Sequence, residues 1–407
     1  MTNDSGSPKT QDTGGATPQQ TPGVRFEPVP FDALPGWAHD DHAAALIVFD
    51  RSCARVVKAM RVGAKMGDVV PPPAFPDACA AAADLVAKRA GTEEARAFFE
   101  RHFHPHRVVH DAAEGLFTGY FEPVVKGALQ KSDAFNAPLM RRPADLVNLV
   151  SEAERGAKAD GLTHARQTAA GPEPYPTRRQ IDEGALAPLG LEFVYLQDPV
   201  EVFFMQVQGS GLVELPDGSH LRVAYDGKNG HAYTSIGRYL IEKGIVPAER
   251  MSLDALKQWL RANPQQMRDV LWQNASYVFF RPLAGEEASD PLGVLGIPLT
   301  PGRSLAVDTR FHAIGTPVYV SAAALKHSDA GKDGFHRLMI AQDVGSAIRG
   351  PERGDIYFGS GDAAGRVAGV TKHAGNFFVL LPRAAPRESI IEAARAGAWK
   401  KIRQARQ

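Results

Sequence analysis

Three aspartates in the last quarter of the chain are the side chains best placed to do chemistry. Asp343 and Asp355 lie twelve residues apart in AQDVGSAIRGPERGDIYFGSG, and Asp308 precedes them in SLAVDTRFHAIGTPVYV. Each lies beside glycines or in an apolar run typical of a β-strand. Because a lone acid group is costly to bury, three of them in one short region indicate a shared polar site.

Asp355 has the surroundings that a general acid requires. Gly354 precedes it, and the apolar residues 356–358 follow it. A carboxyl group among such side chains loses water, which raises its pKa toward the range in which it can donate a proton near neutral pH. A strand-end aspartate that accepts a hydrogen bond from a turn amide explains the same pattern equally well, so both interpretations stay open.

The other two aspartates are better suited to supporting work. Asp343 is followed by Gly345 and Ser346, an arrangement that can cap a short helix or accept bonds from backbone N–H groups. Asp308 lies two residues before Arg310 and can pair with it or orient a loop. We therefore favour a structural role for both.

A second group of motifs is typical of a carbohydrate-binding groove. They are FTGYFEP at 117–123, FFMQVQGSG at 203–211 and GKNGHAY at 227–233. Glycines let a backbone approach a ligand, aromatic rings offer flat surfaces to pyranose rings, and amides and hydroxyls bond sugar hydroxyl or acetamido groups. Such residues also occur in β-domains that bind no ligand, so that alternative stays open. The candidate substrate-binding residues, with one from the Asp355 strand, are Tyr120, Phe121, Gln206, Gln208, Gly209, Ser210, Asn229 and Tyr357.

Other kinds of site are not expected. The histidines of HFHPHRVVH at 102–110 have no nearby carboxylate or cysteine to complete a metal site, and Pro105 interrupts their spacing. The chain has no Walker loop, GxGxxG or GxSxG, which argues against nucleotide, dinucleotide and serine-hydrolase chemistry. Lys plus Arg equals Asp plus Glu at 46 each, so no overall charge favours nucleic acid. We expect no cofactor and no metal.

The length and composition indicate two domains. The chain has 407 residues, of which 44% are hydrophobic, and single cores stop growing at roughly 250–300 residues. No apolar run is long enough to predict a membrane-spanning helix. The first residues are poor in apolar side chains and show no secretory signal pattern. The expected segments are a disordered leader at 1–28, a helical part at 29–116, a β-rich domain at 117–275, a second β-rich domain at 276–385 and a C-terminal helix at 386–407.

Local signals place the elements within these segments. Apolar positions at helical spacing predict helices over 41–60 and 75–103. The run at 205–215 has the texture of a strand, and the PDG that follows it predicts a hairpin turn. Helices return within 233–272, one of them capped by Ser252. The predicted fold class is mainly β with α.

Taken in order, the motifs resemble those of the membrane-bound lytic murein transglycosylase A family. The resemblance covers roughly residues 29–385 and is carried by FTGYFEP, FFMQVQGSG, GKNGHAYTSIGRYLIEKG, the YVFFR before GIPLTPGRSLAVD, and AQDVGSAIRGPERGDIYFGSG. The last of these resembles the three-aspartate domain of that family. The resemblance implies a double-psi β-barrel domain with N-terminal helices and an inserted second β-rich domain, with glycan lying in the groove between them.

The resemblance also implies an activity. Family members are lytic transglycosylases that cleave the β-1,4 bond between N-acetylmuramic acid and N-acetylglucosamine in peptidoglycan and leave 1,6-anhydro-muramyl ends. Asp355 matches the catalytic aspartate, and Asp343 and Asp308 match supporting acidic positions. Peptidoglycan strands are then the expected partner, with other cell-wall enzymes as further candidates. An inverting polysaccharide hydrolase and a non-catalytic wall-binding module are the alternatives.

Two cysteines bear on the compartment. By spacing alone, Cys53 and Cys79 could form a disulfide or be two buried apolar residues. Proteins of the family are typically exported, often with a signal and a lipidated cysteine, and this sequence shows neither feature. The resemblance nevertheless implies a periplasmic or outer-membrane-associated protein, and this location favours the disulfide.

Overall fold

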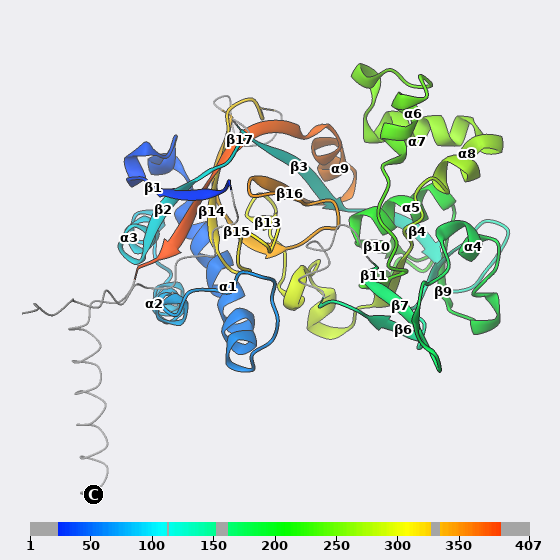
Figure 1. Ribbon diagram of the computed structural model, residues 1–407, viewed down its shortest axis with the longest axis horizontal. Helices are drawn as coiled ribbons and strands as arrows, with labels where there is room; N and C mark the ends of the chain where they lie inside the picture. The colour runs from blue at the N-terminus through cyan, green and yellow to red at the C-terminus, as the bar shows by residue number, and fades with distance from the viewer. Residues whose placement is uncertain (1–22, 112–113, 152–161, 327–333, 384–407) are drawn as a thin grey trace, which may run out of the picture.

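A computed structural model describes residues 23–111, 114–151, 162–326 and 334–383. Figure 1 shows two lobes side by side, with the N- and C-terminal thirds of the described chain in one and the middle of the chain in the other. The sheet-rich architecture with helices confirms the predicted fold class. The expected C-terminal helix at 386–407 and most of the expected leader lie outside the described residues.

The first lobe is built on an eight-stranded sheet that closes on itself. A pairing of β17 with β3 at the end of the strand order joins the sheet into a barrel. Its interior holds fully buried apolar side chains such as Phe117, Leu305 and Phe377. In strand order the sheet consists of β1 (Arg25–Pro28), β2 (Phe103–Val109), β17 (Lys372–Pro382), β14 (Pro317–Ala322), β15 (Phe335–Asp343), β13 (Ser304–Ala306), β16 (Arg353–Ser360) and β3 (Gly115–Glu122).

Three N-terminal helices pack against the barrel. They are α1 (His42–Arg61), α2 (Phe75–Ala87) and α3 (Thr92–His102), and Asp41 caps α1 by accepting a hydrogen bond from the Ala44 N–H. Phe49 of α1 is fully buried among four other phenylalanine rings, at centroid distances of 5.6–6.2 Å. Burying one such side chain contributes roughly 2–3 kcal/mol. A disulfide joins Cys53 of α1 to Cys79 of α2.

The second lobe contains a six-stranded sheet and a small three-stranded one. The larger sheet has the order β12 (Val278–Pro282), β11 (His220–Lys228), β10 (Ser210–Glu214), β4 (Val124–Ala128), β9 (Glu192–Leu196) and β5 (Ala137–Met140). The smaller one consists of β6 (Leu146–Asn148), β7 (His164–Thr168) and β8 (Gly171–Glu173). The helices of this lobe are α4 (Arg178–Asp182), α5 (Pro199–Gln208), α6 (Ile236–Glu242), α7 (Leu253–Ala262) and α8 (Pro264–Leu271), and α9 (Gly361–Val370) lies against β3 and β16 of the barrel.

A buried ion pair joins the lobes where the chain passes from β3 to β4. Glu122 ends β3 and is fully buried, and it accepts hydrogen bonds from Arg222 Nε of β11 at 2.8 Å and from Ser360 Oγ of β16 at 2.7 Å. These contacts bring both sheets to one carboxylate. Because a buried charge must be paired, the pair holds the walls of the interlobe cleft in register.

Several local predictions are confirmed and others are wrong. The hairpin of β10 and β11 and the Ser252 cap of α7 are present. Residues 205–208 belong to α5, not to a strand, because Asp198 caps a helix that ends only at Gly209, whose φ is +84°. The strand β1 falls inside the expected leader, and β2 inside the expected helical part, because each is stabilised by pairing with the other.

The sheet memberships differ from the expected domain limits by a few residues. β3 runs past position 117, where the second domain was expected to begin, but belongs to the barrel. β12 begins after position 276 but belongs to the second lobe. Strand texture alone cannot tell which of two sheets a strand will join. We propose that the crossings between lobes lie at Pro123 and just after Pro282.

Candidate active site

Four neighbouring strands bring two of the predicted aspartates to one place. Ala306 of β13 pairs with Asp343 of β15 on one side and with Asp355 of β16 on the other, and Asp355 pairs in turn with Thr118 of β3. Residues directly opposite one another project from the same face of a sheet. The row therefore presents both carboxyl groups on one face, separated by the small side chain of Ala306.

Asp355 is held by a short polar chain. It is partly buried, and its Oδ1 accepts a hydrogen bond from Thr118 Oγ1. Thr118 Oγ1 in turn accepts one from Arg353 Nη2 at 2.8 Å. Burial raises the pKa of Asp355, while the Arg353 charge and the Thr118 hydrogen bond act against that rise. The raised pKa is the property that a general acid needs.

Asp343 is an acceptor in a different network. Its Oδ2 accepts from the Tyr120 hydroxyl at 3.1 Å, and its Oδ1 accepts from the Val344 N–H at 2.8 Å. Burial, and next the negative charge of Asp343, raise the pKa of Tyr120 well above its ordinary value. Tyr120 therefore remains a hydroxyl donor at physiological pH and fixes the orientation of the Asp343 carboxylate.

Asp308 lies apart from this pair in its contacts. Its side chain is fully buried and accepts hydrogen bonds from the Arg310 guanidinium, at 2.6 Å for Nη2, and from the Gly350 N–H at 2.8 Å. It does not line the cavity that Asp343 and Asp355 share. Its contacts are those of the predicted pairing with Arg310, and they anchor the segment that leads to β16.

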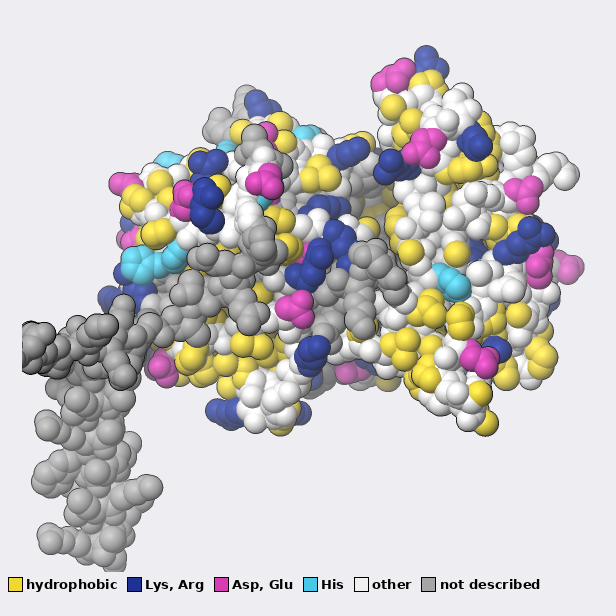
Figure 2. All heavy atoms as spheres, viewed as in Figure 1, with side chains coloured by type: hydrophobic (Ala, Val, Ile, Leu, Met, Phe, Trp, Pro, Cys, Tyr) yellow, Lys and Arg dark blue, Asp and Glu magenta, His cyan; other side chains and the backbone are white. Residues whose placement is uncertain are grey.

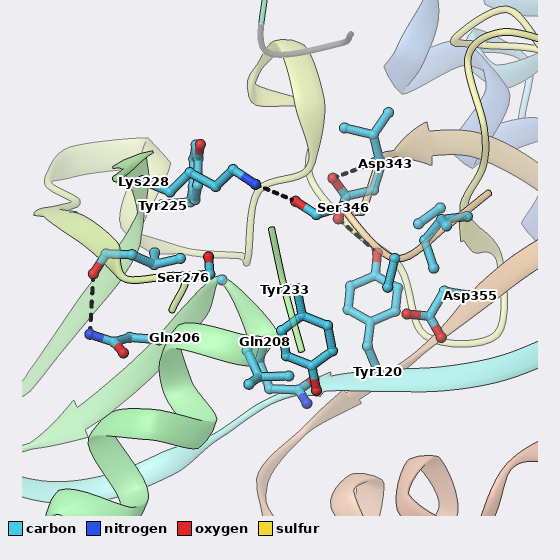
Figure 3. A pocket seen from close by; sticks show the side chains of 18 of the residues that line it. Tyr120, Gln206, Gln208, Tyr225, Lys228, Tyr233, Ser276, Asp343, Ser346 and Asp355 are labelled. Carbon is cyan, nitrogen blue, oxygen red and sulfur yellow. Dashed lines mark hydrogen bonds between the residues drawn. The ribbon is translucent and has the colours of Figure 1, made fainter. Parts of the chain in front are cut away.

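The two aspartates line a cavity of about 260 Å³ between the lobes. Figure 3 shows Asp343, Asp355 and Tyr120 on one side of it and Gln206, Tyr225 and Lys228 on the other. A neighbouring cavity of about 190 Å³ shares Tyr120, Gln208, Gly209, Tyr225 and Asp343 with the first and adds Ser210. Because they share these residues, the two cavities adjoin beside Asp343, and together they are called the groove.

The predicted binding residues divide into two groups. Tyr120, Gln206, Gln208, Gly209 and Ser210 line the groove. Phe121 instead packs against Ala364 and Ala368 of α9, and Tyr357 is buried behind Tyr120, with ring centroids 5.2 Å apart.

Asn229 is also turned away from the groove. It is fully buried, and its amide donates to the carbonyls of Pro176 and Ala275, both at 2.8 Å. Its Oδ1 accepts from the Tyr277 N–H at 2.8 Å. These bonds hold neighbouring loops together, which is a structural task.

Several residues of the site lie in or beside the quoted motifs but were not predicted. Lys228 and Tyr233 of GKNGHAY line the groove, as does Arg353, which precedes Gly354. Thr118 of FTGYFEP does not line the cavity but bonds Asp355. Tyr233 is 37% exposed, which leaves part of its ring open to a ligand at the cavity wall. Their proximity to glycines was an available signal. Arg178 also lines the groove, and no motif marked it.

The charge on the visible surface is mixed, as the equal numbers of basic and acidic residues predict. On the face that Figure 2 shows, basic and acidic side chains are interspersed without a large area of one sign. Within the described ranges, no three His, Cys, Asp or Glu side chains gather as a metal site would require. None of the described helices is long and apolar enough to cross a membrane.

Comparison with known proteins identifies the family. Residues 116–281 match the MltA specific insert domain, and residues 303–381 match the 3D domain. A membrane-bound lytic murein transglycosylase A of Vibrio cholerae is 38% identical over 269 residues, which are 65% of this chain and 65% of that protein. The aligned region is thus just under two thirds of that relative's length.

Solved structures extend the likeness over more of the chain. A membrane-bound lytic murein transglycosylase from Agrobacterium tumefaciens is 34% identical, with a TM-score of 0.75 over 88% of this chain and 98% of that one. Escherichia coli MltA with bound chitohexaose is 26% identical, with a TM-score of 0.63 over 93% and 98%. These likenesses support a double-psi β-barrel with an inserted domain. The chain belongs to the membrane-bound lytic murein transglycosylase A family.

Proposed function

We propose that this protein is a lytic transglycosylase that cleaves the β-1,4 bond between N-acetylmuramic acid and N-acetylglucosamine in peptidoglycan. One observation carries the proposal. Asp355 lines the interlobe groove in surroundings that raise its pKa, and Thr118 is the side chain that holds it there. The family relatives named above, which are lytic murein transglycosylases, support the same reaction.

Asp355 serves first as an acid and then as a base. In the protonated state it donates its proton to the glycosidic oxygen as the bond to the anomeric carbon breaks. The C6 hydroxyl of the same sugar attacks that carbon and closes the 1,6-anhydro ring, and the Asp355 carboxylate accepts the hydroxyl proton. The tethered hydroxyl replaces water as the nucleophile, so a second catalytic carboxylate is not required.

Asp343 supports this chemistry and is also the residue on which an alternative would depend. It lines the same cavity across Ala306 from Asp355. An inverting hydrolase would use Asp343 as a base to activate water. Asp308 cannot take that role, because it is fully buried and paired with Arg310. Asp343 instead fixes Tyr120 at the groove.

The proposed substrate places the protein outside the cytoplasm. The relatives are named membrane-bound, and the E. coli structure holds chitohexaose, an N-acetylglucosamine polymer. The Cys53–Cys79 disulfide supports an oxidising compartment. We infer a periplasmic or outer-membrane-associated protein whose partner is the glycan strand, and other cell-wall enzymes remain further candidate partners.

The test is product analysis after digestion of purified sacculi. Wild-type protein is expected to release muropeptides with 1,6-anhydro ends and without oxygen from ¹⁸O-labelled water. Asp355→Asn is expected to release none while keeping the same circular dichroism spectrum, and Asp362→Asn, at an exposed aspartate of α9, to behave as wild type. Reducing ends that carry ¹⁸O would establish hydrolysis. Unchanged glycan lengths with wild-type protein would establish a binding module.

A further inference from the structure

Arg178 is a buried cation in the wall that the second lobe contributes to the groove. It begins α4, is 3% exposed and lines the cavity that contains Asp355. Its Nε donates to the Asn274 carbonyl at 3.1 Å, and its Nη2 donates to the Ser276 carbonyl at 2.7 Å. The guanidinium also lies over the Phe203 ring, 4.7 Å from its centroid. These contacts fix the plane of the guanidinium.

No carboxylate forms a hydrogen-bonded ion pair with Arg178 in the part of the chain that the structure describes. Both of its hydrogen bonds go to neutral carbonyl oxygens, and its Nη1 donates to none of the described residues. Asp182 of the same helix lies near enough for its charge to favour the guanidinium, but its carboxylate accepts from Trp272 Nε1 instead. Arginine stays protonated in proteins, so this charge persists although burial disfavours it. Burying a cation without a bonded anion is costly, and a bound ligand anion would offset part of that cost.

A second cation lies on the same wall. Lys228 of β11 is 4% exposed and lines the same cavity. Its Nζ donates to Ser346 Oγ at 3.2 Å, across the cavity, and to the His231 carbonyl at 3.4 Å. Figure 3 shows Lys228 reaching from the second lobe toward the barrel loop that carries Ser346. Its ammonium group is therefore at the groove.

The two walls of the groove differ in charge. The barrel contributes the carboxyl groups of Asp343 and Asp355 together with Arg353, whose guanidinium bonds Thr118 Oγ1 beside Asp355, whereas the second lobe contributes only the cations of Arg178 and Lys228 to this cavity. A ligand anion would therefore be attracted more strongly to the wall of the second lobe. A neutral polymer of N-acetylglucosamine would use only the hydroxyl and amide contacts of this groove.

We propose that Arg178 and Lys228 form a binding site for a carboxylate carried by the muramyl substituent of the glycan. This site rests on the proposed substrate. It assigns the residues by which the protein would distinguish a peptidoglycan strand from a neutral chitin chain. Two sources supply the same chemistry. A strand without peptide has the carboxylate of its lactyl ether, and a strand with peptide has the carboxylates of the peptide.

The experiment measures binding in an inactive background, Asp355→Asn, so that cleavage does not interfere. Calorimetry compares chitohexaose, a peptide-free muramyl-containing hexasaccharide and its peptide-bearing counterpart. Lys228→Met is expected to weaken binding of a carboxylate-bearing ligand about tenfold and that of chitohexaose less than twofold. Lys126→Met, on β4 and lining a different cavity, is the matched control and is expected to change neither. Added salt is expected to weaken only the charged ligand.

The remaining outcomes separate the two proposals. Arg178→Gln is expected to show the same selective loss, and if it does not fold, Lys228→Met decides alone. An equal loss for neutral and charged ligands, or no loss with Lys228→Met, would overturn the carboxylate site. The ligand that loses affinity identifies the source of the carboxylate. Binding is measured in a variant that does not cleave, so the two proposals fail separately. If the wild-type protein produced no anhydro ends, the proposed reaction would be refuted but the carboxylate site would not.

Discussion

Burial raises the pKa of Asp355, and the hydroxyl of Thr118 is one of two groups that oppose that rise. Its effect can be tested with one nearly isosteric substitution. Thr118→Val keeps the β-branched shape that suits β3 but removes the hydrogen bond to Asp355 Oδ1. That bond stabilises the charged carboxylate and so lowers the pKa of Asp355. Without this bond, less opposes the effect of burial, and the pKa of Asp355 is expected to rise further.

The size of the effect follows from the strength of one charge-assisted hydrogen bond. Such a bond is worth roughly 1.5–3 kcal/mol, and part of this is recovered by water because Asp355 is only partly buried. The protonation equilibrium should therefore change by about tenfold, which moves the alkaline limb of the pH–rate profile up by about one pH unit. A general acid works only when protonated, so activity extends to higher pH.

The assay is the rate of anhydro-muropeptide release from sacculi between acid and alkaline pH. Thr118→Ser keeps the hydroxyl and should leave the profile where it is in the wild type. Arg353 also donates to the carbonyls of Leu116 and Gly354, so it is expected to stay in place when Thr118 Oγ1 is lost. An alkaline limb that moves to lower pH would refute the reasoning, because it would show that Arg353 itself had taken over the contact with Asp355.

Three further predictions concern stability. Burial raises the pKa of Asp355 in the folded state, so the stability that its protonated form allows is lost as the pH rises through that pKa. Asp355→Asn should therefore have a higher melting temperature than the wild type at neutral pH, and the difference should shrink in acid. Arg222→Met leaves Glu122 buried without its cation and should cost about 3 kcal/mol in urea unfolding; a loss below 1 kcal/mol would contradict the bridging role. Replacing Cys53 and Cys79 by alanine removes a cross-link between residues 26 apart and should lower the free energy of unfolding by about 3.5 kcal/mol. Wild-type protein whose disulfide has been chemically reduced should unfold at the same urea concentration as this double variant.

The fold could be predicted where the signal is local. Ser252 caps α7 through the Ala255 N–H, and the PDG turn joins β10 to β11. Each signal acts within a few residues of itself. Strand β1 could not be predicted in this way, because its residues have a leader-like composition and its partner β2 lies about eighty residues further along the chain.

The site was predictable in its residue types but not in its grouping. Asp355, Asp343 and Tyr120 were predicted to lie at the site, and the structure brings them to one cavity. Asp308 was predicted to have a structural role beside Arg310, and its contacts are of that kind. Asn229 was predicted to bind substrate, yet it is fully buried in structural bonds. A sequence shows which side chains can bond, whereas the pairing of strands decides which of them face the groove.

The register of four strands explains how one fold can keep two neighbouring carboxyl groups in different roles. Asp343 and Asp355 occupy the same row on either side of Ala306, but their donors differ. Asp343 accepts from a tyrosine hydroxyl and a backbone N–H, whereas Asp355 accepts from the Thr118 side chain and is otherwise desolvated. A slip of one residue between β13 and β16 would turn Asp355 to the other face. The closed barrel prevents that slip, so Asp355, the proposed proton donor, owes its position to strand pairing and its raised pKa to its burial there.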